Sequence, residues 1–198
     1  MIKALLVALI KVISGVNVRW IESPLLTGQC IYFANHTSHL DAVVLWAALP
    51  PEVRDKTRPV AAKDYWKASK MRRYLALKVF HSILIDRARV TARNNPIRLI
   101  IDEMGERYSL IIFPEGGRNF GGDIGQFKSG LYHLAMEKPQ AKLVPVFIDN
   151  MNRILPKGEI LPVPMLSCIS FGTPISVAPD ENKATFLERA RLAICNLK

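Results

Sequence analysis

Short apolar runs alternate with longer segments whose apolar residues recur every three or four positions along most of the chain. The short runs predict strands at residues 30–34, 58–62, 82–85, 109–113, 142–148 and 165–171. The longer segments predict helices at residues 38–48, 67–79, 95–107, 128–137 and 180–197. Because strands and helices alternate, we expect an α/β fold.

The first 18 residues are apolar apart from four positions that share one side of a helical wheel, namely Lys3, Lys11, Ser14 and Asn17. A spanning helix needs about 20 apolar residues, and Lys11 interrupts this segment too early. We expect residues 1–20 to form an amphipathic helix in the membrane interface, and residues 21–198 to form a single domain. Packing of the helix on that domain and a signal peptide are the two alternatives.

The strand at 30–34 leads into a histidine and an aspartate five positions apart, His36 and Asp41. Ser38 and Asp41 have the spacing of a capping box, so His36 is expected in the strand-to-helix turn and Asp41 in the first helical turn. A neutral imidazole held by a carboxylate is a general base suited to pH 7. Capping alone would also explain Asp41, and His39 is the alternative base.

The strand at 109–113 ends in a glycine-containing loop that carries Glu115, Gly116, Gly117 and Arg118. Glycines let a backbone approach a ligand closely, and an arginine can bind a phosphate through two hydrogen bonds. Sites in α/β folds gather beyond strand ends, so this loop could share a cleft with Asp41 and with Arg87. The combination indicates a hydroxyl activated near a phosphate.

The net charge of +10 is concentrated in one part of the 198-residue chain. Residues 54–98 contain thirteen basic and three acidic residues, so this span alone accounts for the excess. Such a block favours anionic partners: phospholipid headgroups, acyl carrier protein, coenzyme A or nucleic acid. A solvated basic face is the simpler interpretation.

The three cysteines, Cys30, Cys168 and Cys195, are far apart and lack the paired spacing of a zinc site. They fit a reducing compartment, and no metal ion is expected.

Six blocks occur in an order that resembles the glycerolipid acyltransferase family. They are His-x4-Asp at 36–41, Ser-Ile-Leu-Ile-Asp-Arg at 82–87, Phe-Pro-Glu-Gly-Gly-Arg at 113–118, Phe-Lys-Ser-Gly at 127–130, Val-Pro-Val at 144–146 and Phe-Gly-Thr-Pro-Ile at 171–175. The family includes 1-acylglycerol-3-phosphate and glycerol-3-phosphate acyltransferases. The resemblance implies a mixed, largely parallel central sheet flanked by helices.

The resemblance also implies an O-acyltransferase at the cytoplasmic face of a membrane. A fatty acyl group would move from a coenzyme A or acyl-carrier-protein thioester to the free hydroxyl of 1-acylglycerol-3-phosphate (lysophosphatidic acid), giving phosphatidic acid without a cofactor. His36 would be the base and Asp41 would orient it. The implied substrate-binding residues are Arg87, Glu115, Gly116, Gly117, Arg118 and Lys128, with both arginines on the acceptor phosphate.

Two departures leave the acceptor open. Gly117 and Asn119 stand where many members have Thr and Ser, and this form resembles the glycerol-3-phosphate branch, whereas the short chain resembles the lysophosphatidic acid branch. Glycerol-3-phosphate or another lysolipid is therefore the alternative acceptor. A basic nucleic-acid-binding or membrane-binding domain is the alternative of another class. The chain lacks interleaved aromatic platforms and a known binding motif, so no specific nucleic acid is expected.

Overall fold

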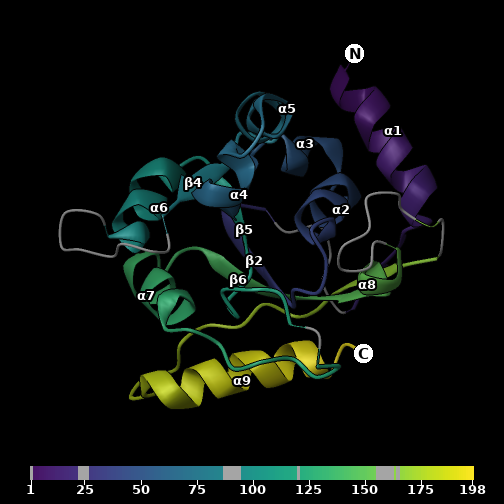
Figure 1. The fold of residues 1–198 in the computed structure, drawn as a ribbon. Helices are drawn as coiled ribbons and strands as arrows, with labels where there is room; N and C mark the ends of the chain where they lie inside the picture. The colour runs from purple at the N-terminus through teal and green to yellow at the C-terminus, as the bar shows by residue number, and fades with distance from the viewer. Residues whose placement is uncertain (1, 22–26, 87–94, 120, 155–162, 164–165) are drawn as a thin grey trace.

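The computed structural model describes residues 2–21, 27–86, 95–119, 121–154, 163 and 166–198. In these residues seven strands form one sheet in the order β1-β7-β6-β2-β5-β3-β4 (Figure 1). The strands are β1 Asn17–Trp20, β2 Cys30–Ala34, β3 Thr57–Ala62, β4 Ile83–Ile85, β5 Ser109–Ile112, β6 Lys142–Asp149 and β7 Cys168–Phe171. All neighbouring pairs are parallel except β6 and β7. The expected mixed, largely parallel α/β sheet is confirmed.

Helices cover both faces of the sheet (Figure 1). They are α1 Ile2–Ser14, α2 Asp41–Ala48, α3 Pro51–Arg54, α4 Lys63–Lys67, α5 Lys70–Tyr74, the π-helical turn η1 Leu75–Val79, α6 Pro96–Met104, α7 Gly130–Glu137, α8 Met151–Ile154 and α9 Lys183–Cys195.

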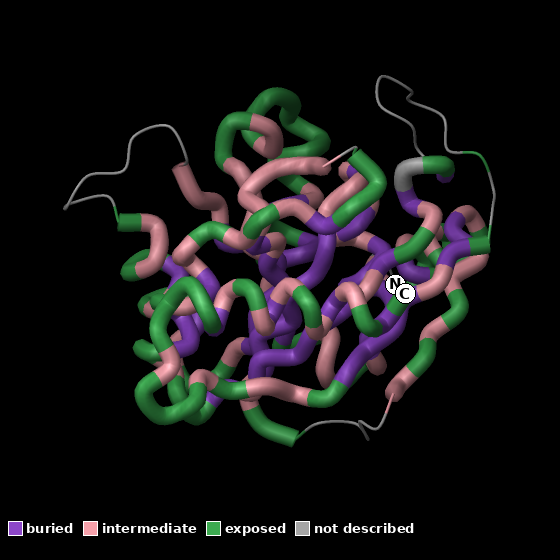
Figure 2. Tube along the Cα trace, turned by 90° about the horizontal axis from the view of Figure 1, so that it is seen from below, coloured by how far each residue is buried: buried purple, intermediate pink, exposed green. Residues whose placement is uncertain are grey.

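The central strand β2 is buried along its whole length, as a parallel strand covered on both faces must be. Successive side chains of a strand point to opposite faces. Tyr32 accordingly packs in the cluster with α1 and α2, and Ile31 and Phe33 pack in the cluster with α6, α7 and α9. Figure 2 shows this buried interior surrounded by exposed segments. The core therefore fixes β2, and with it the loop that follows β2.

One expected helix start is confirmed by its capping residue. Asn95 accepts a hydrogen bond from the Ile97 amide, Pro96 occupies the first turn, and Gly105 follows α6 with φ 50°. Helix α9 begins three residues later than expected, at Lys183, because Asn182 caps it by accepting from the Thr185 amide at 3.0 Å.

Several expected boundaries were wrong. The single helix expected at 67–79 is divided, because Ser69 caps a new helix by accepting from the Arg72 amide, and α5 then passes into η1. The helix expected from residue 38 begins at Asp41, and the strand expected from residue 165 begins at Cys168. The amino-terminal helix ends at Ser14, and residues 17–20 form β1, an unpredicted strand that pairs with β7.

Helix α1 has two apolar faces. Val7 is buried, and Leu6, Ile10 and Ile13 pack against the core beside α2. On the other face Leu5 and Val12 are 74% and 77% exposed. In the described residues no helix is both long enough and apolar enough to cross a bilayer. One face of α1 thus belongs to the domain and the other faces solvent.

A buried asparagine fixes the chain at the point where it leaves β2. The Asn35 side chain donates to the Ile148 carbonyl at 2.9 Å and accepts from the Ile148 amide at 2.8 Å. These two bonds continue the β2–β6 pairing one step beyond Ala34. They hold the backbone directly before His36.

We expect Asn35→Ala to lower the free energy of unfolding by about 2–4 kcal/mol, because it leaves two buried main-chain groups of Ile148 unpartnered. Urea denaturation measures this change. The exposed Asn196, at the end of α9, provides the control, and Asn196→Ala should change stability by less than about 0.5 kcal/mol. Equal free energies of unfolding for the two variants would contradict the role assigned to the Asn35 side chain.

Candidate active site

His36 and Asp41 form a close pair at the carboxyl end of β2. The Nδ1 atom of His36 lies 2.9 Å from Oδ2 of Asp41, and their side chains are 21% and 1% exposed. A carboxylate has no proton to give, so Nδ1 donates and Nε2 is left as the proton acceptor of the ring. The imidazole also stacks on Phe113, with 4.3 Å between ring centroids.

One oxygen atom of Asp41 holds both the imidazole and the turn before α2. Oδ2 accepts from the amides of Thr37 and Ser38 at 2.6 and 2.8 Å as well as from His36. Of the capping box expected at Ser38, the bond from the Ser38 amide to the carboxylate is present, but α2 begins only at Asp41, and no side chain caps it at Leu40. Oδ1 is buried and has no hydrogen-bond partner among the described residues. Fixing the turn and holding the imidazole are therefore performed by the same atom.

Glu115 connects the His36 turn to the glycine loop. Its Oε1 accepts from the His36 amide and its Oε2 accepts from the Gly125 amide, both at 2.9 Å. A Cβ atom at Gly125 would lie 2.8 Å from Oε2, so only glycine permits this approach. Glu115 thus hydrogen bonds main-chain amides on both sides of the site, and its expected contact with substrate stays a prediction.

The loop that carries Arg118 bonds directly to the backbone of His36. Gly116 has φ 71°, in the left-handed region that favours glycine, and its amide donates to the Phe113 carbonyl. The Asn119 amide then donates to the His36 carbonyl at 2.8 Å. Arg118 precedes that contact, so the fold holds its backbone beside the His36–Asp41 pair.

The electrostatics of His39 also indicate a cationic site. Burial, followed by the charges of Arg118, His36 and Arg72, lowers the pKa of His39 to about 4. The His39 ring stacks on the Tyr65 ring, with 4.2 Å between their centroids. The Arg72 guanidinium lies 4.5 Å from the centre of the same Tyr65 ring. No carboxylate pairs with His39 in the described part of the chain, so the geometry favours His36 over His39 as the base.

The remaining expected site residues have different outcomes. The exposed Lys128 lies across Gly116, since a Cβ atom there would meet Lys128 Nζ at 2.8 Å. Gly117 has open space where its Cβ would be. Arg87 lies outside the described residues. Within the described residues no three His, Cys, Asp or Glu side chains are placed to hold a metal ion.

Sequence reasoning missed four residues that shape the site. Asn35 and Gly125 flank the recognised motifs, and Phe113 begins one of them. A buried asparagine beside a motif could have been noticed. Tyr65 had no such signal, because only the fold brings it to His39. Together these residues fix an imidazole with one proton-accepting nitrogen next to an arginine-bearing loop. This arrangement can take a proton from a hydroxyl and attract an anion to it.

Comparisons with known proteins show the family of the chain. A family model described as "Acyltransferase" matches residues 15–149. The 1-acyl-sn-glycerol-3-phosphate acyltransferase of Limnanthes alba is 32% identical over 142 residues, 69% of this chain and 47% of that protein. The enzyme of that name from Escherichia coli K12 is 27% identical over 140 residues, 64% of this chain and 52% of that protein. The chain thus spans about half the length of the curated relatives it matches.

A solved structure has the same fold. The crystal structure of the 1-acyl-sn-glycerophosphate (LPA) acyltransferase of Thermotoga maritima matches with a TM-score of 0.73 and 20% identity, covering 99% of this chain and 78% of that one. The family model covers more than half of the chain and contains His36, Asp41, Glu115 and Arg118. The chain therefore belongs to the acyltransferase family.

We expect the low pKa of His39 to make stability depend on pH. The folded state binds this proton only near pH 4, whereas an unfolded histidine binds it near 6.5. The contribution is complete above about pH 6.5 and is lost as the pH falls toward 4. Because the ring is partly exposed, we expect an effect of about 1 kcal/mol.

Urea denaturation at pH 4.5 and 7.5 measures this effect. His39→Phe keeps a ring against Tyr65 and should reduce the stability difference between the two pH values. The exposed His133 is the control, and His133→Gln should leave the difference as in the wild type. A His39→Phe protein with the wild-type difference would exclude His39 as its source.

Proposed function

We propose that the chain is an O-acyltransferase that transfers a fatty acyl group from an acyl thioester to the free hydroxyl of 1-acylglycerol-3-phosphate. The observation that carries the proposal is the 2.9 Å bond between His36 and Asp41, held against the loop that bears Arg118. The names of the curated relatives support the same acceptor. The thioester of coenzyme A or of acyl carrier protein is the donor.

The reaction needs one proton acceptor and no covalent enzyme intermediate. Nε2 of His36 takes the proton of the acceptor hydroxyl as its oxygen attacks the thioester carbonyl carbon. The tetrahedral intermediate collapses by breaking the carbon–sulfur bond, and Nε2–H returns the proton to the thiolate. Asp41 keeps Nδ1 protonated and stabilises the imidazolium formed in between.

The acceptor phosphate sets the position of the hydroxyl. Arg118 binds the phosphate from the loop bonded to His36, and Arg87 and Lys128 are further proposed contacts. Glu115 acts by holding the amides of His36 and Gly125, so that base and loop keep a fixed separation. Positioning of this kind can remove several kcal/mol from a bimolecular barrier.

Replacing His36 by Ala should lower kcat by at least 10²-fold, the usual contribution of a general base, while the protein stays folded. Mass spectrometry of products from coenzyme A and acyl-carrier-protein thioesters, each offered lysophosphatidic acid or glycerol-3-phosphate, is the assay. His133→Ala is the matched control and should retain wild-type activity. Phosphatidic acid formed at the wild-type rate by His36→Ala would refute the role of His36. A monoacyl product from glycerol-3-phosphate would mean that the acceptor is glycerol-3-phosphate, and the proposed role of His36 as the base would be unchanged.

We also propose that the enzyme works on a membrane surface, bound through α1 at the cytoplasmic face. The face of α1 turned away from the core carries Leu5, Leu9 and Val12, all more than half exposed. Helix α5 has a similar character, with Met71 71% exposed beside the basic Lys70 and Arg73. Both helices lie at the top of the molecule in Figure 1. Apolar side chains flanked by cations are typical of interfacial helices on anionic lipid.

Removing the exposed apolar side chains of α1 should weaken vesicle binding. We expect Leu5→Gln with Val12→Gln to raise the dissociation constant for phosphatidylglycerol-containing vesicles at least tenfold, about 1.4 kcal/mol. Flotation measures bound protein. Met136→Gln with Leu192→Gln removes two exposed apolar side chains elsewhere, which are 54% and 45% exposed, and should leave binding unchanged. Equal losses in the two double variants would exclude α1 as the membrane contact.

A further inference from the structure

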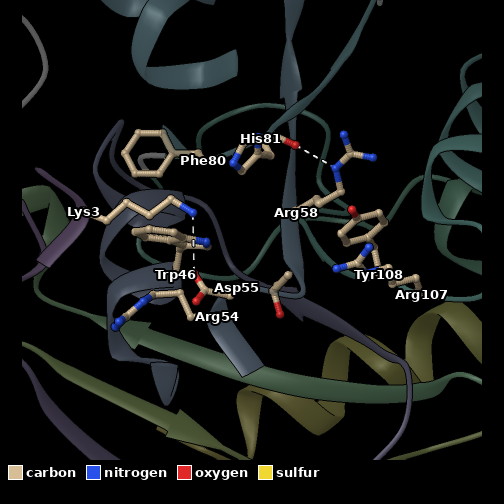
Figure 3. Close-up of a pocket in the computed structure, with 10 residues that line it drawn as sticks. Lys3, Trp46, Arg54, Asp55, Arg58, Phe80, His81, Arg107 and Tyr108 are labelled. Carbon is tan, nitrogen blue, oxygen red and sulfur yellow. Dashed lines mark hydrogen bonds and ion pairs between the residues drawn. The ribbon is translucent and has the colours of Figure 1, made fainter. Parts of the chain in front are cut away.

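A cavity lies at the opposite end of the strands from His36. It has a volume of about 240 Å³ and is shown in Figure 3. It is lined by Lys3, Trp46, Arg54, Asp55, Thr57, Arg58, Phe80, His81, Arg107 and Tyr108. Thr57 begins β3, Tyr108 directly precedes β5, and only Ser82 separates His81 from β4. The cavity is therefore at the amino ends of these three parallel strands.

This position separates the cavity from the candidate active site. His36 and Glu115 follow the carboxyl ends of β2 and β5. At a rise of about 3.3 Å per residue, β3 alone places its two ends roughly 16 Å apart. Neither His36 nor Asp41 lines the cavity, so a ligand here would occupy a different site.

Cations outnumber anions around the cavity. Among the described residues, four basic side chains line it together with one carboxylate, that of Asp55. Lys3 Nζ lies 3.5 Å from Asp55 Oδ1. This exposed ion pair is of the kind that contributes little stability. Arg58 is held by Glu103 at 2.8 Å. The field inside the cavity is therefore positive.

Arg107 is the cation best placed to bind a ligand. Its guanidinium carbon lies 5.3 Å from the centre of the Tyr108 ring, and it has no carboxylate partner among the described residues. Arg54 differs, since it donates to the Leu49 carbonyl, and in Figure 3 its guanidinium points away from the cavity. In Figure 3 the Arg107 guanidinium points toward the other side chains.

The apolar walls of the cavity reduce the screening of its positive charges by water. Trp46 and Phe80 are buried, and their rings meet edge to face at 5.1 Å. Tyr108 forms the opposite wall, with the Arg58 guanidinium 4.7 Å from its ring centre. Charges beside apolar walls act through a lower effective dielectric than charges in open water. An anion entering the cavity would meet cations that water screens only in part.

His81 occupies the rim in an unusual backbone conformation. Its φ of 50° is left-handed, and its carbonyl accepts from Arg58 Nε at 2.9 Å. Partial burial and the charges of Lys3 and Arg58 lower the pKa of its imidazole. A non-glycine residue held in this region by its neighbours is common at functional sites. The Leu77 main chain accepts one hydrogen bond from this ring. An anion in the cavity would therefore be bound by the second N–H of the protonated ring.

We propose that this cavity is a second binding site, which takes a phosphate monoester group through Lys3, His81 and Arg107. The volume equals that of about eight waters and is below the range for drug-sized ligands, so the phosphate enters and any attached chain stays outside. Because Lys3 comes from α1, an occupied site links that helix to the sheet more firmly than the Lys3–Asp55 pair alone. The phosphate is either free or the headgroup of a phosphatidic-acid-type lipid.

Histidine side-chain NMR of the ¹⁵N-labelled protein tests this site. His36 reports on the candidate active site and His81 on the cavity, so one titration with inorganic phosphate follows both separately. We expect a saturable shift of the His81 signals, and at least a fivefold higher dissociation constant in Arg107→Ala. Lys183→Ala removes an exposed lysine from α9 and should bind as the wild type does. An unmoved His81, or equal affinities in wild type and Arg107→Ala, would overturn the proposal.

A second titration identifies the source of the phosphate. Dihexanoyl phosphatidic acid, kept below its micelle concentration, is compared with dihexanoyl phosphatidylcholine and with inorganic phosphate. A tighter effect of phosphatidic acid on His81 supports a lipid headgroup, and an equal effect of both phosphates supports the free ion. An equal effect of phosphatidylcholine would contradict a phosphate monoester site. A shift of the His36 signals alone would be consistent with the proposed active site and would contradict phosphate binding in the cavity.

Discussion

The structure of the site depends on one carboxylate oxygen. Oδ2 of Asp41 accepts three hydrogen bonds, from the amides of Thr37 and Ser38 and from Nδ1 of His36. The two amide bonds fix the carboxylate at the start of α2, and the third fixes the imidazole relative to that helix. A buried acceptor with three donors also defines which ring nitrogen carries the proton. The helix start and the base are therefore one structural unit, and disrupting either disrupts the other.

The sheet extends this unit to the rest of the molecule. Asn35 bonds the turn to β6, Glu115 bonds it to the loop after β5, and Asn119 bonds that loop back to the His36 carbonyl. The carboxyl ends of β2 and β5 thus carry a proton acceptor and a cation within one rigid frame. The amino ends of β3, β4 and β5 carry the cationic cavity, so β5 has the candidate active site at its carboxyl end and the proposed phosphate site at its amino end.

Much of this arrangement could be predicted from the sequence, because its signals are local. Strand β2 is one apolar run, α6 begins at an Asn-Pro pair, and the His36–Asp41 spacing already implied contact across a turn. The misplaced boundaries also have local causes, such as Ser69, which caps α5 inside an apparently continuous helix. Strand β1 was missed because its four residues pair with β7, about 150 positions away, and no local signal marks them as a strand. The Tyr65–His39 stack and the cationic cavity arise from segments that only the fold brings together.

The most direct test of the account is the tautomer of His36, read from the ¹⁵N signals of its ring at pH 7.5. If Asp41 Oδ2 accepts from Nδ1–H, the spectrum of the wild-type protein shows a protonated Nδ1 and an unprotonated Nε2, the nitrogen that takes the proton of the acceptor. A protonated Nε2 with an unprotonated Nδ1 would mean that Asp41 does not hold the ring in this way. The unprotonated nitrogen of His36 would then be Nδ1, which faces Asp41, and Nε2 could not take the proton of the acceptor hydroxyl.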